Sequence, residues 1–202
     1  MTSYHIWYIN LDTRNDRRSS IESQLRATGL LPHATRFSAI SHEKGYIGCA
    51  ASHVACLKAA LESNVEFAVI MEDDAAWRIS LLEAKTRLES ACSESFDVMV
   101  LGSSTYGFKS QPIPGSQYKR ALAAQTTTAY IVRRAYIPTL LACFEKAHQN
   151  LLLGARESDA VIDVAWKTLQ AKDMWLIPVP SWVVQESSYS DIRKANVSYP
   201  FV

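Results

Sequence analysis

The sequence predicts an α/β fold in which helices cover both faces of a mostly parallel central sheet. Short runs that are apolar at every position alternate along the chain with longer segments of helical periodicity. Strands that are apolar on both sides belong in sheets that are covered on both faces. A length of 202 residues suits one sizeable domain, and we expect residues 1–202 to form it.

The first predicted strand is the apolar and aromatic run Tyr4–Leu11. Asn15 or Asp16 can cap a helix that follows it. Thr35–Ile40 is short and apolar at alternate positions, so it predicts a second strand.

The same alternation continues to the end of the chain. Further helices are predicted at Gly48–Ser63, Ser80–Cys92, Ala135–Gln149 and Ser158–Gln170. Further strands are predicted at Phe67–Met71, Val98–Leu101, Arg120–Ala124, Thr128–Val132 and Met174–Val179. The polar segment Ser103–Lys119, with two prolines and two glycines, predicts a long surface loop, and Gln185–Val202 is expected to be irregular.

Composition excludes several classes of protein. The formal net charge is +1, so we expect no nucleic-acid partner. No apolar run approaches the ~18 to 20 residues of a membrane span, and the N-terminal segment lacks the apolar run of a signal peptide. The four cysteines include no C-x-x-C pair and are expected to be free thiols. These features predict a cytoplasmic protein, with peripheral membrane contact left open.

The predicted sheet also predicts where a ligand binds. In open α/β sheets, ligands lie outside the carboxyl ends of the strands. In this sequence the rule points to four segments: Leu11–Arg18, Ile40–His42, Glu72–Asp74 and Gly102–Thr105.

Three consecutive carboxylates, Glu72, Asp73 and Asp74, directly follow the apolar strand Phe67–Met71. Like charges at the end of a buried strand repel one another, and burying them unpaired costs several kcal/mol. Mg²⁺ or Mn²⁺ removes this conflict, because both ions prefer oxygen ligands and keep positions open for phosphate. The alternative is a solvated turn whose acids cap a helix.

Two other segments carry chemistry with a plainer alternative. The arginines of the segment 12–18 lie beside a helix N-terminus and suit phosphate or nucleotide recognition, or they are simply solvated. Cys49, His53 and Cys56 lie on one helix face with a spacing that zinc could use. A fourth ligand is missing, so a packed helix face is the alternative, with Ser52 or His53 making a hydrogen bond.

Eight segments in this order resemble glycosyltransferase family 25, the lipopolysaccharide and lipooligosaccharide sugar transferases. The first is YINLDTRNDRRSSIESQL, in which a strand ends in an I-N-L-D-x-R-x-D-R-R pattern. The others are RFSAI, GCAASH, AVIMEDDA, VLGSS, TTTAYIV, VID and VPSWVVQESSYSDI. The resemblance implies a GT-A-like, Rossmann-type sandwich that binds a nucleotide sugar.

The family resemblance also implies an activity and a set of partners. Members transfer a sugar, often galactose or glucose, from a UDP-sugar with inversion. The acceptor implied here is a lipooligosaccharide or a related glycan, and the enzyme is expected at the cytoplasmic face of the inner membrane or free in the cytoplasm. Two rivals stay open: a metal-dependent phosphohydrolase or nucleotidyltransferase, and an inactive nucleotide-binding domain.

By the same resemblance, Asp74 holds the Mn²⁺ or Mg²⁺ ion, and Glu72 or Asp73 contacts ribose or shares the ion. The sequence has no histidine after His148, so Asp191 or water would stand in for the late histidine ligand of some GT-A enzymes. Around the nucleotide sugar the resemblance places Leu11, Arg14, Ile40 and Ser52.

Inversion also needs a general base to deprotonate the acceptor hydroxyl. Asp163, in the VID segment, is the candidate, and Glu157 and Asp159 are competitors. The alternative role for Asp163 is helix capping or an ion pair with Lys167, four residues on.

Overall fold

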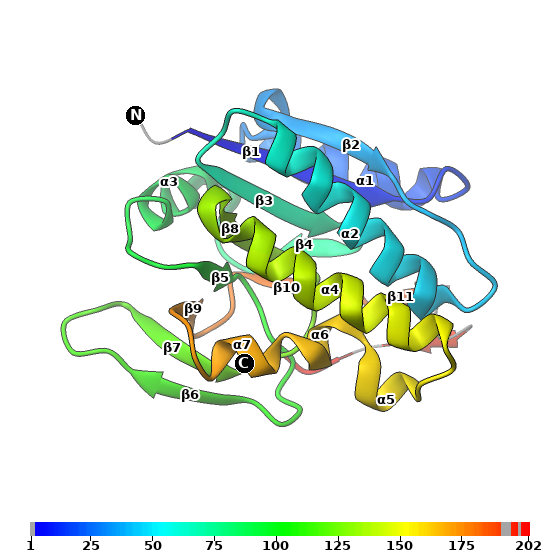
Figure 1. The fold of residues 1–202 in the computed structure, drawn as a ribbon. Helices are drawn as coiled ribbons and strands as arrows, with labels where there is room; N and C mark the ends of the chain where they lie inside the picture. Colours follow the sequence, from blue (N-terminus) through cyan, green and yellow to red (C-terminus); the bar gives the residue numbers. More distant parts are fainter. Residues whose placement is uncertain (1–2, 191–194, 198) are drawn as a thin grey trace.

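The fold is built on an eight-stranded sheet with the order β2-β1-β3-β8-β5-β9-β7-β6 (Figure 1). The computed structural model describes residues 3–190, 195–197 and 199–202. The strands of this sheet are β1 (Tyr4–Asn10), β2 (Ala34–Ser38), β3 (Phe67–Glu72), β5 (Val98–Val100), β6 (Lys109–Pro112), β7 (Tyr118–Ala123), β8 (Ala129–Arg133) and β9 (Trp175–Pro178). Two small pairs stand apart, β4 (Ala75–Trp77) with β10 (Val183–Gln185) and β11 (Ser188–Ser190) with β12 (Ala195–Val197).

The sheet is mostly parallel, as predicted. Strand β1 runs parallel to both of its neighbours, β2 and β3, and β5 runs parallel to β9. Only β8 and β7 are reversed: β8 is antiparallel to β3 and β5, and β7 is antiparallel to β9 and β6. The carboxyl ends of β1, β2, β3 and β5 therefore share one edge with the start of β8.

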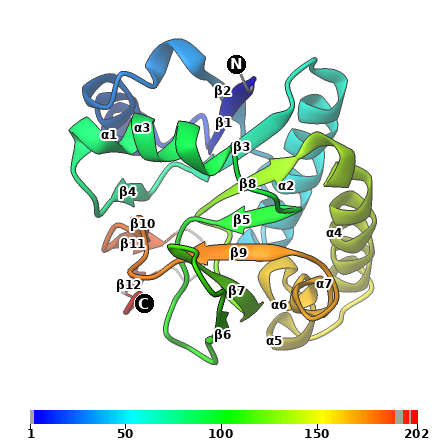
Figure 2. The same ribbon diagram turned by 90° about the vertical axis from the view of Figure 1, so that its left-hand side faces the viewer.

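Helices cover both faces of the sheet (Figure 2), which confirms the predicted fold class. The helices are α1 (Asn15–Ala27), α2 (Gly45–Glu62), α3 (Leu81–Ala91), α4 (Ile137–Leu152), α5 (Glu157–Ala160), α6 (Ile162–Ala165) and α7 (Lys167–Gln170), with 3₁₀ turns at Leu31–His33 and Arg134–Tyr136. Helices α1 and α3 pack on one face with β4, and α2, α4 and the short helices pack on the other.

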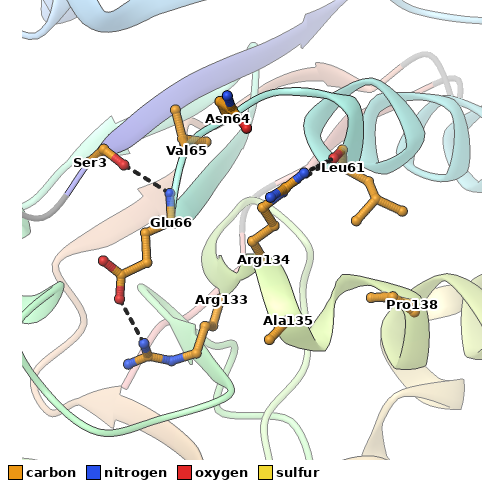
Figure 3. A pocket seen from close by; sticks show the side chains of 9 residues that line it. All are labelled: Ser3, Leu61, Asn64, Val65, Glu66, Arg133, Arg134, Ala135 and Pro138. Atoms are coloured by element: carbon orange, nitrogen blue, oxygen red, sulfur yellow. Dashed lines mark hydrogen bonds and ion pairs between the residues drawn. The ribbon is translucent and has the colours of Figure 1, made fainter.

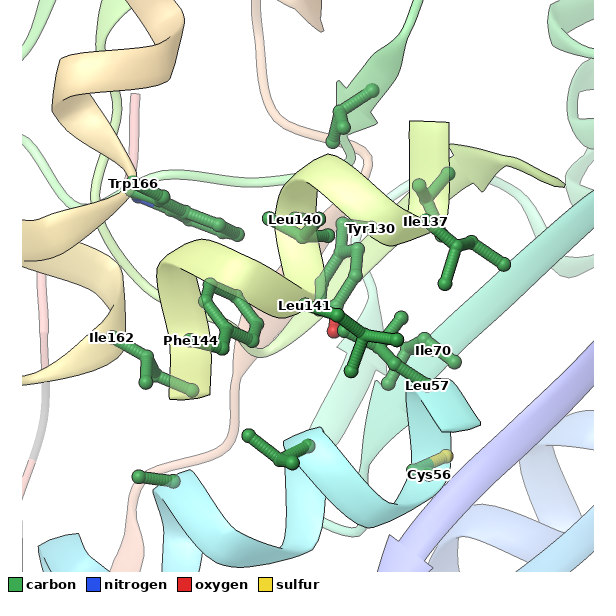
Figure 4. Packing of buried hydrophobic residues seen from close by; sticks show 14 of the residues in the cluster. Cys56, Leu57, Ile70, Tyr130, Ile137, Leu140, Leu141, Phe144, Ile162 and Trp166 are labelled. Atoms are coloured by element: carbon green, nitrogen blue, oxygen red, sulfur yellow. The ribbon is translucent and has the colours of Figure 1, made fainter. Parts of the chain in front are cut away.

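The core on the α2 and α4 face is aromatic and aliphatic (Figure 4). Ile70 of β3 and Tyr130 of β8 meet Leu57 of α2 and Phe144 of α4, and Trp166 closes the cluster from the end of α6. Each of these side chains is fully buried. Burial of such side chains contributes about 1.5–3 kcal/mol each, so this layer holds α2 firmly against the sheet.

The predicted helix Ser158–Gln170 is wrong, because three short helices occupy this segment. Val161 is extended, with φ −62° and ψ 148°, and it separates α5 from α6. Both Ala160 and Ile162 are buried. In a continuous helix, side chains two residues apart in sequence point about 200° away from each other. The break at Val161 therefore allows the side chains of both Ala160 and Ile162 to enter the core.

Three other expectations need correction. The segment 103–119 is not all loop, because it contains β6 and the start of β7, which form a hairpin at the edge of the sheet. The polar residues of this segment suit an exposed edge strand. The irregular C-terminal segment includes the end of β10 and the β11–β12 pair. Neither Asn15 nor Asp16 caps α1: Arg14 is the N-cap residue, without a side-chain capping bond.

Candidate active site

A cavity of about 290 Å³ lies at the carboxyl edge of the sheet, where the strand order changes direction around β1 and β3. Loops after β1 and β2, the end of β3 and the first half of α2 supply its walls. Its lining includes Leu11, Ile40, Ser52, Glu72, Asp73 and Asp74, which are six of the eight predicted site residues. Nucleotides bind at such switch points in open α/β sheets.

The other two predicted residues do not line the cavity. Arg14 instead forms a two-pronged ion pair with Asp16, with its Nη2 2.7 Å from Asp16 Oδ2. Asp163 lies in the first turn of α6 and is not among the residues that line the cavity. Asp191, the expected substitute for a late histidine ligand, falls outside the described residues.

Two of the three consecutive carboxylates are bound by one arginine from α1. Arg17 Nη1 donates to Asp73 Oδ1 at 3.0 Å and to Asp74 Oδ2 at 2.8 Å. Asn10 Nδ2 donates to the other oxygen of Asp73 at 2.7 Å, and Gln185 Nε2 donates to Asp74 Oδ2 at 3.1 Å. Helix α1 and strands β1, β3 and β10 thus all contribute to holding these acids.

The environment raises the pKa of both aspartates. Burial and the charge of Glu72 raise the pKa of Asp74 to about 7, and Arg17 only partly opposes this shift. Burial also raises the pKa of Asp73, against the hydrogen bonds of Asn10 and Arg17. Asp74 Oδ1 is buried and has no hydrogen-bond partner in the described part of the chain. The other three oxygens of Asp73 and Asp74 each accept at least one hydrogen bond.

Glu72 is held differently, by groups on α2 and in the turn before β8. Thr127 Oγ1 donates to Glu72 Oε1 at 2.6 Å, and His53 Nε2 lies 3.3 Å from the same oxygen. Burial raises the pKa of Glu72, but His53 and Thr127 outweigh it and leave the pKa below its ordinary value. Of the three acids, Glu72 is therefore the one whose pKa is lowered.

Asp163 is connected to Glu72 through the turn that precedes β8. The Thr126 backbone N–H and the Gln125 side chain both bond Asp163, and the next residue, Thr127, donates to Glu72. Burial and the charge of Glu72 raise the pKa of Asp163 above its ordinary value. Lys167, the ion-pair partner in the alternative role for Asp163, donates from Nζ to Gln125 Oε1 at 2.7 Å.

Of the two competitors for the role of base, Asp159 is exposed. Its carboxylate pairs with Arg156 at 2.7 Å, and the hydrogen bonds of Ser158 and Arg156 lower its pKa. A lowered pKa suits a structural ion pair better than proton abstraction. Asp163, half-buried with a raised pKa, has the better environment for a base.

Gly48 allows the loop after β2 to approach helix α2. A Cβ atom at this position would lie 2.5 Å from the Ile40 carbonyl oxygen and 3.1 Å from the His42 nitrogen. Ser52 Oγ holds the same loop by accepting the Ile40 N–H at 2.8 Å. The small residues of GCAASH therefore set the position of one cavity wall.

Replacing Gly48 with alanine is expected to destabilise the protein by about 1–2 kcal/mol, because overpacking outweighs the gain in helix propensity. Urea unfolding measures this change. A gain in stability, as expected for Gly→Ala at an open helical position, would contradict the close approach.

The raised pKa of Asp74 predicts a pH dependence of stability in metal-free protein. A carboxyl group whose pKa is higher in the folded protein than in the unfolded chain makes its full contribution to folding stability at pH values below the unfolded pKa. This contribution is lost as the pH rises through the folded pKa. For Asp74 the window runs from pH 3.8 to about 7. Its contribution should fall by on the order of 4 kcal/mol across this window.

Thermal melts of wild type and Asp74→Asn in a chelator, at pH 5 and pH 8, test this prediction. The variant should lose less stability between the two pH values than wild type. Asp159→Asn is the matched control, since the lowered pKa of Asp159 keeps it ionised throughout this range. Parallel slopes for wild type and Asp74→Asn would refute the prediction.

A larger cavity, of about 610 Å³, lies at the opposite edge of the sheet (Figure 3). Ser3, Glu66 and Arg133, at the start of β1 and β3 and the end of β8, help to line it. Arg133 bonds Glu66 at 2.9 Å, and Arg134 bonds the Leu61 carbonyl oxygen at 3.2 Å. Its arginines already hold partners within the chain, and ligands of α/β sheets bind at the other edge, so the smaller cavity is the candidate site.

Comparison with known families identifies the chain. The sequence model of a family described as "Glycosyltransferase family 25 (LPS biosynthesis protein)" matches residues 43–152. The chain belongs to glycosyltransferase family 25. The match covers α2, β3 with the three acids, and β8, and membership favours a glycosyltransferase over a phosphohydrolase or nucleotidyltransferase.

Solved structures are similar only at a distance, and no curated protein matches. A mannose-1-phosphate geranyltransferase from Thermus thermophilus shares 10% identity at a TM-score of 0.48, over 88% of this chain and 74% of that one. A glycosyltransferase involved in glycosylation of the major capsid of PBCV-1 shares 8% identity at 0.45, over 88% and 93%. The glycosyltransferase GlyE of Streptococcus pneumoniae TIGR4 shares 10% identity at 0.40, over 88% and 45%.

Among the described residues of this family 25 protein, no helix has both the length and the apolar character needed to span a membrane.

Sequence reasoning missed three residues that hold the acids: Asn10, Arg17 and Gln185. Arg17 lies three residues after Arg14, so the two arginines are neighbours on one helix face and the spacing could not choose between them. Gln185 is 111 residues from Asp74 and reaches it only through the pairing of β10 with β4. No local sequence signal marks such a contact.

Proposed function

We propose that this family 25 enzyme transfers a hexose, galactose or glucose, from a UDP-sugar to a lipooligosaccharide or related glycan with inversion. The observation that carries the proposal is the cavity at the switch point, with three carboxylates on one wall and Arg17 among them. A nucleoside diphosphate is an anion, so it binds beside carboxylates only if further positive charge accompanies it.

The residues at the site fit a bound Mn²⁺ or Mg²⁺ ion. When ionised, Glu72, Asp73 and Asp74 carry three negative charges, and Arg17 returns one positive charge. A divalent cation would balance the remaining two. Asp74 would hold it through Oδ1, the buried oxygen without a partner in the described chain, and Glu72 would share it. When bound, the ion neutralises the charge that develops on the departing diphosphate.

The chain's own residues would position the donor. Leu11 and Ile40 present apolar surface to the cavity, and Ile40 is 44% exposed, so both are free to contact the uracil ring. Ser52 would act through the loop, because its hydroxyl accepts the Ile40 N–H and donates to the Gly48 carbonyl oxygen. Asp73 would contact the ribose. Arg14 would bind the nucleotide from outside the cavity wall, beside its partner Asp16.

Asp163 would act as the general base. A carboxylate with a raised pKa accepts a proton from the acceptor hydroxyl more readily near neutral pH. Gln125 and the Thr126 N–H orient it, and Thr126 adopts a φ of 104°, which is rare for a β-branched residue. Strain of this kind collects where a functional group must be held in place.

A donor and acceptor screen tests the proposed function. Purified enzyme with Mn²⁺, a panel of UDP-hexoses and a truncated lipooligosaccharide acceptor should give an acceptor one hexose heavier, with stoichiometric UDP, in mass spectrometry. The anomeric configuration of the product should be opposite to that of the donor. Retention of configuration, or transfer only from another nucleotide sugar, would overturn the corresponding part of the proposal. We propose that the reaction occurs in the cytoplasm, either free in solution or at the cytoplasmic face of the inner membrane.

A further inference from the structure

Three side chains of different chemistry converge at the inner end of the cavity. Cys49 and His53 lie one turn apart on α2, and Glu72 ends β3. One donor atom from each side chain, a thiol sulfur, a ring nitrogen and a carboxylate oxygen, lies within 4.8 Å of the other two. All three residues also line the cavity.

The separation between His53 and Glu72 suits two ligands of one tetrahedral metal ion. Zinc binds nitrogen and oxygen at about 2.0–2.2 Å, so two such ligands at a tetrahedral angle lie about 3.3–3.5 Å apart. His53 Nε2 and Glu72 Oε1 are 3.3 Å apart. Hydrogen bonds of this type are mostly shorter, at about 2.7–3.2 Å.

Neighbouring groups orient the ligands as they do in known metal sites. The Tyr130 hydroxyl lies 3.1 Å from His53 Nδ1, which leaves Nε2 directed at Glu72. Thr127 Oγ1 donates to Glu72 Oε1 at 2.6 Å. Hydrogen bonds on the far nitrogen of a histidine and on a ligating carboxylate fix the orientation of metal ligands.

We propose that Cys49, His53 and Glu72 form a binding site for one Zn²⁺ ion, with the fourth position open to the cavity. A thiolate beside an imidazole favours zinc over the hard ions Mg²⁺ and Mn²⁺. The site differs from the Asp74 site in its ligands and metal, and only Glu72 belongs to both. The proposal of a zinc site holds whichever sugar the donor carries.

The helix spacing suggested Cys49, His53 and Cys56 as zinc ligands, and the structure changes the third of these. Cys56 is fully buried in the core beside Leu57 (Figure 4), and Glu72 from β3 takes the third place. Cys56 therefore serves as a matched control, since it is a thiol on the same helix with no part in the site.

Cobalt titration of reduced, metal-free protein tests the site. Co²⁺ should bind with a stoichiometry of one per chain and produce thiolate-to-cobalt charge-transfer absorption, which Zn²⁺ then removes. Cys49→Ser should abolish this band, and His53→Gln should weaken Co²⁺ binding at least about tenfold. Cys56→Ser should retain the band. Absence of the band in wild type, or its survival in Cys49→Ser, would overturn the proposal.

Two further measurements keep the test decisive. Zinc K-edge X-ray absorption of the wild-type protein does not depend on whether a variant folds. It should show one sulfur ligand at about 2.3 Å and nitrogen or oxygen ligands at about 2.0–2.2 Å; a site without sulfur would overturn the proposal. Asp74→Asn should retain the cobalt band even though it loses Mn²⁺-dependent UDP binding, so failure of the zinc site and failure of the proposed function are distinguishable.

Discussion

Asp163→Asn is expected to reduce the rate of sugar transfer by about 10² to 10⁴-fold while leaving UDP affinity within about twofold of wild type. The amide keeps the shape of the side chain but cannot accept the proton of the acceptor hydroxyl. Because Asp163 does not line the cavity, the loss should appear in kcat and not in donor binding. Initial rates with saturating UDP-hexose, together with calorimetric UDP titration, measure both quantities.

Asp159→Asn is the control for this substitution, because Asp159 is a nearby exposed acid paired with Arg156. It should transfer sugar at close to the wild-type rate. The raised pKa of Asp163 adds a second readout: wild-type activity should fall on the acid side as the pH drops through this pKa. Near wild-type transfer by Asp163→Asn would eliminate it as the base.

Asp74→Asn is expected to abolish Mn²⁺-dependent binding of UDP, with at least about a 100-fold loss of affinity in the presence of the ion. The substitution removes one negative charge and replaces one carboxylate oxygen with an NH₂ group, which cannot bind a cation. Transfer should fall with it, since the diphosphate would leave without its counter-ion. Titration of UDP with and without Mn²⁺ measures the effect.

Glu83→Gln controls for the loss of a single acid, since Glu83 is an exposed residue of α3 that pairs with Arg87. It should bind UDP and Mn²⁺ as wild type does. If Asp74→Asn kept Mn²⁺-dependent UDP affinity, the cation would have to be held elsewhere, and the role proposed for Asp74 would be wrong.

Most of the fold could be predicted from local pattern. The fully apolar runs at β3 and β5 predicted buried strands because strands covered on both faces need no polar alternation. The failures came where tertiary contacts outweigh periodicity. The helical pattern of 158–170 did not show that both Ala160 and Ile162 would enter the core, and the polar hairpin β6–β7 lacks the alternation of a half-buried strand.

The acids of the candidate site could also be predicted from local pattern, but the residues that hold them could not. Acids that end a strand must lie at the carboxyl edge of the sheet, so Glu72, Asp73 and Asp74 could be placed from sequence. The choice of Arg17 over Arg14 depends on how α1 sits against β3, and the contact from Gln185 depends on a strand pair distant in sequence. Such contacts are properties of the folded chain.

Calorimetric titration of UDP into the wild-type protein, with and without Mn²⁺, tests the central claim most directly. The claim is that the cavity between β1, β3 and α2 is a metal-assisted site for a nucleoside diphosphate. One UDP per chain should bind with Mn²⁺ present, and affinity should fall sharply when a chelator removes the ion. Absence of UDP binding both with and without the metal would contradict the claim.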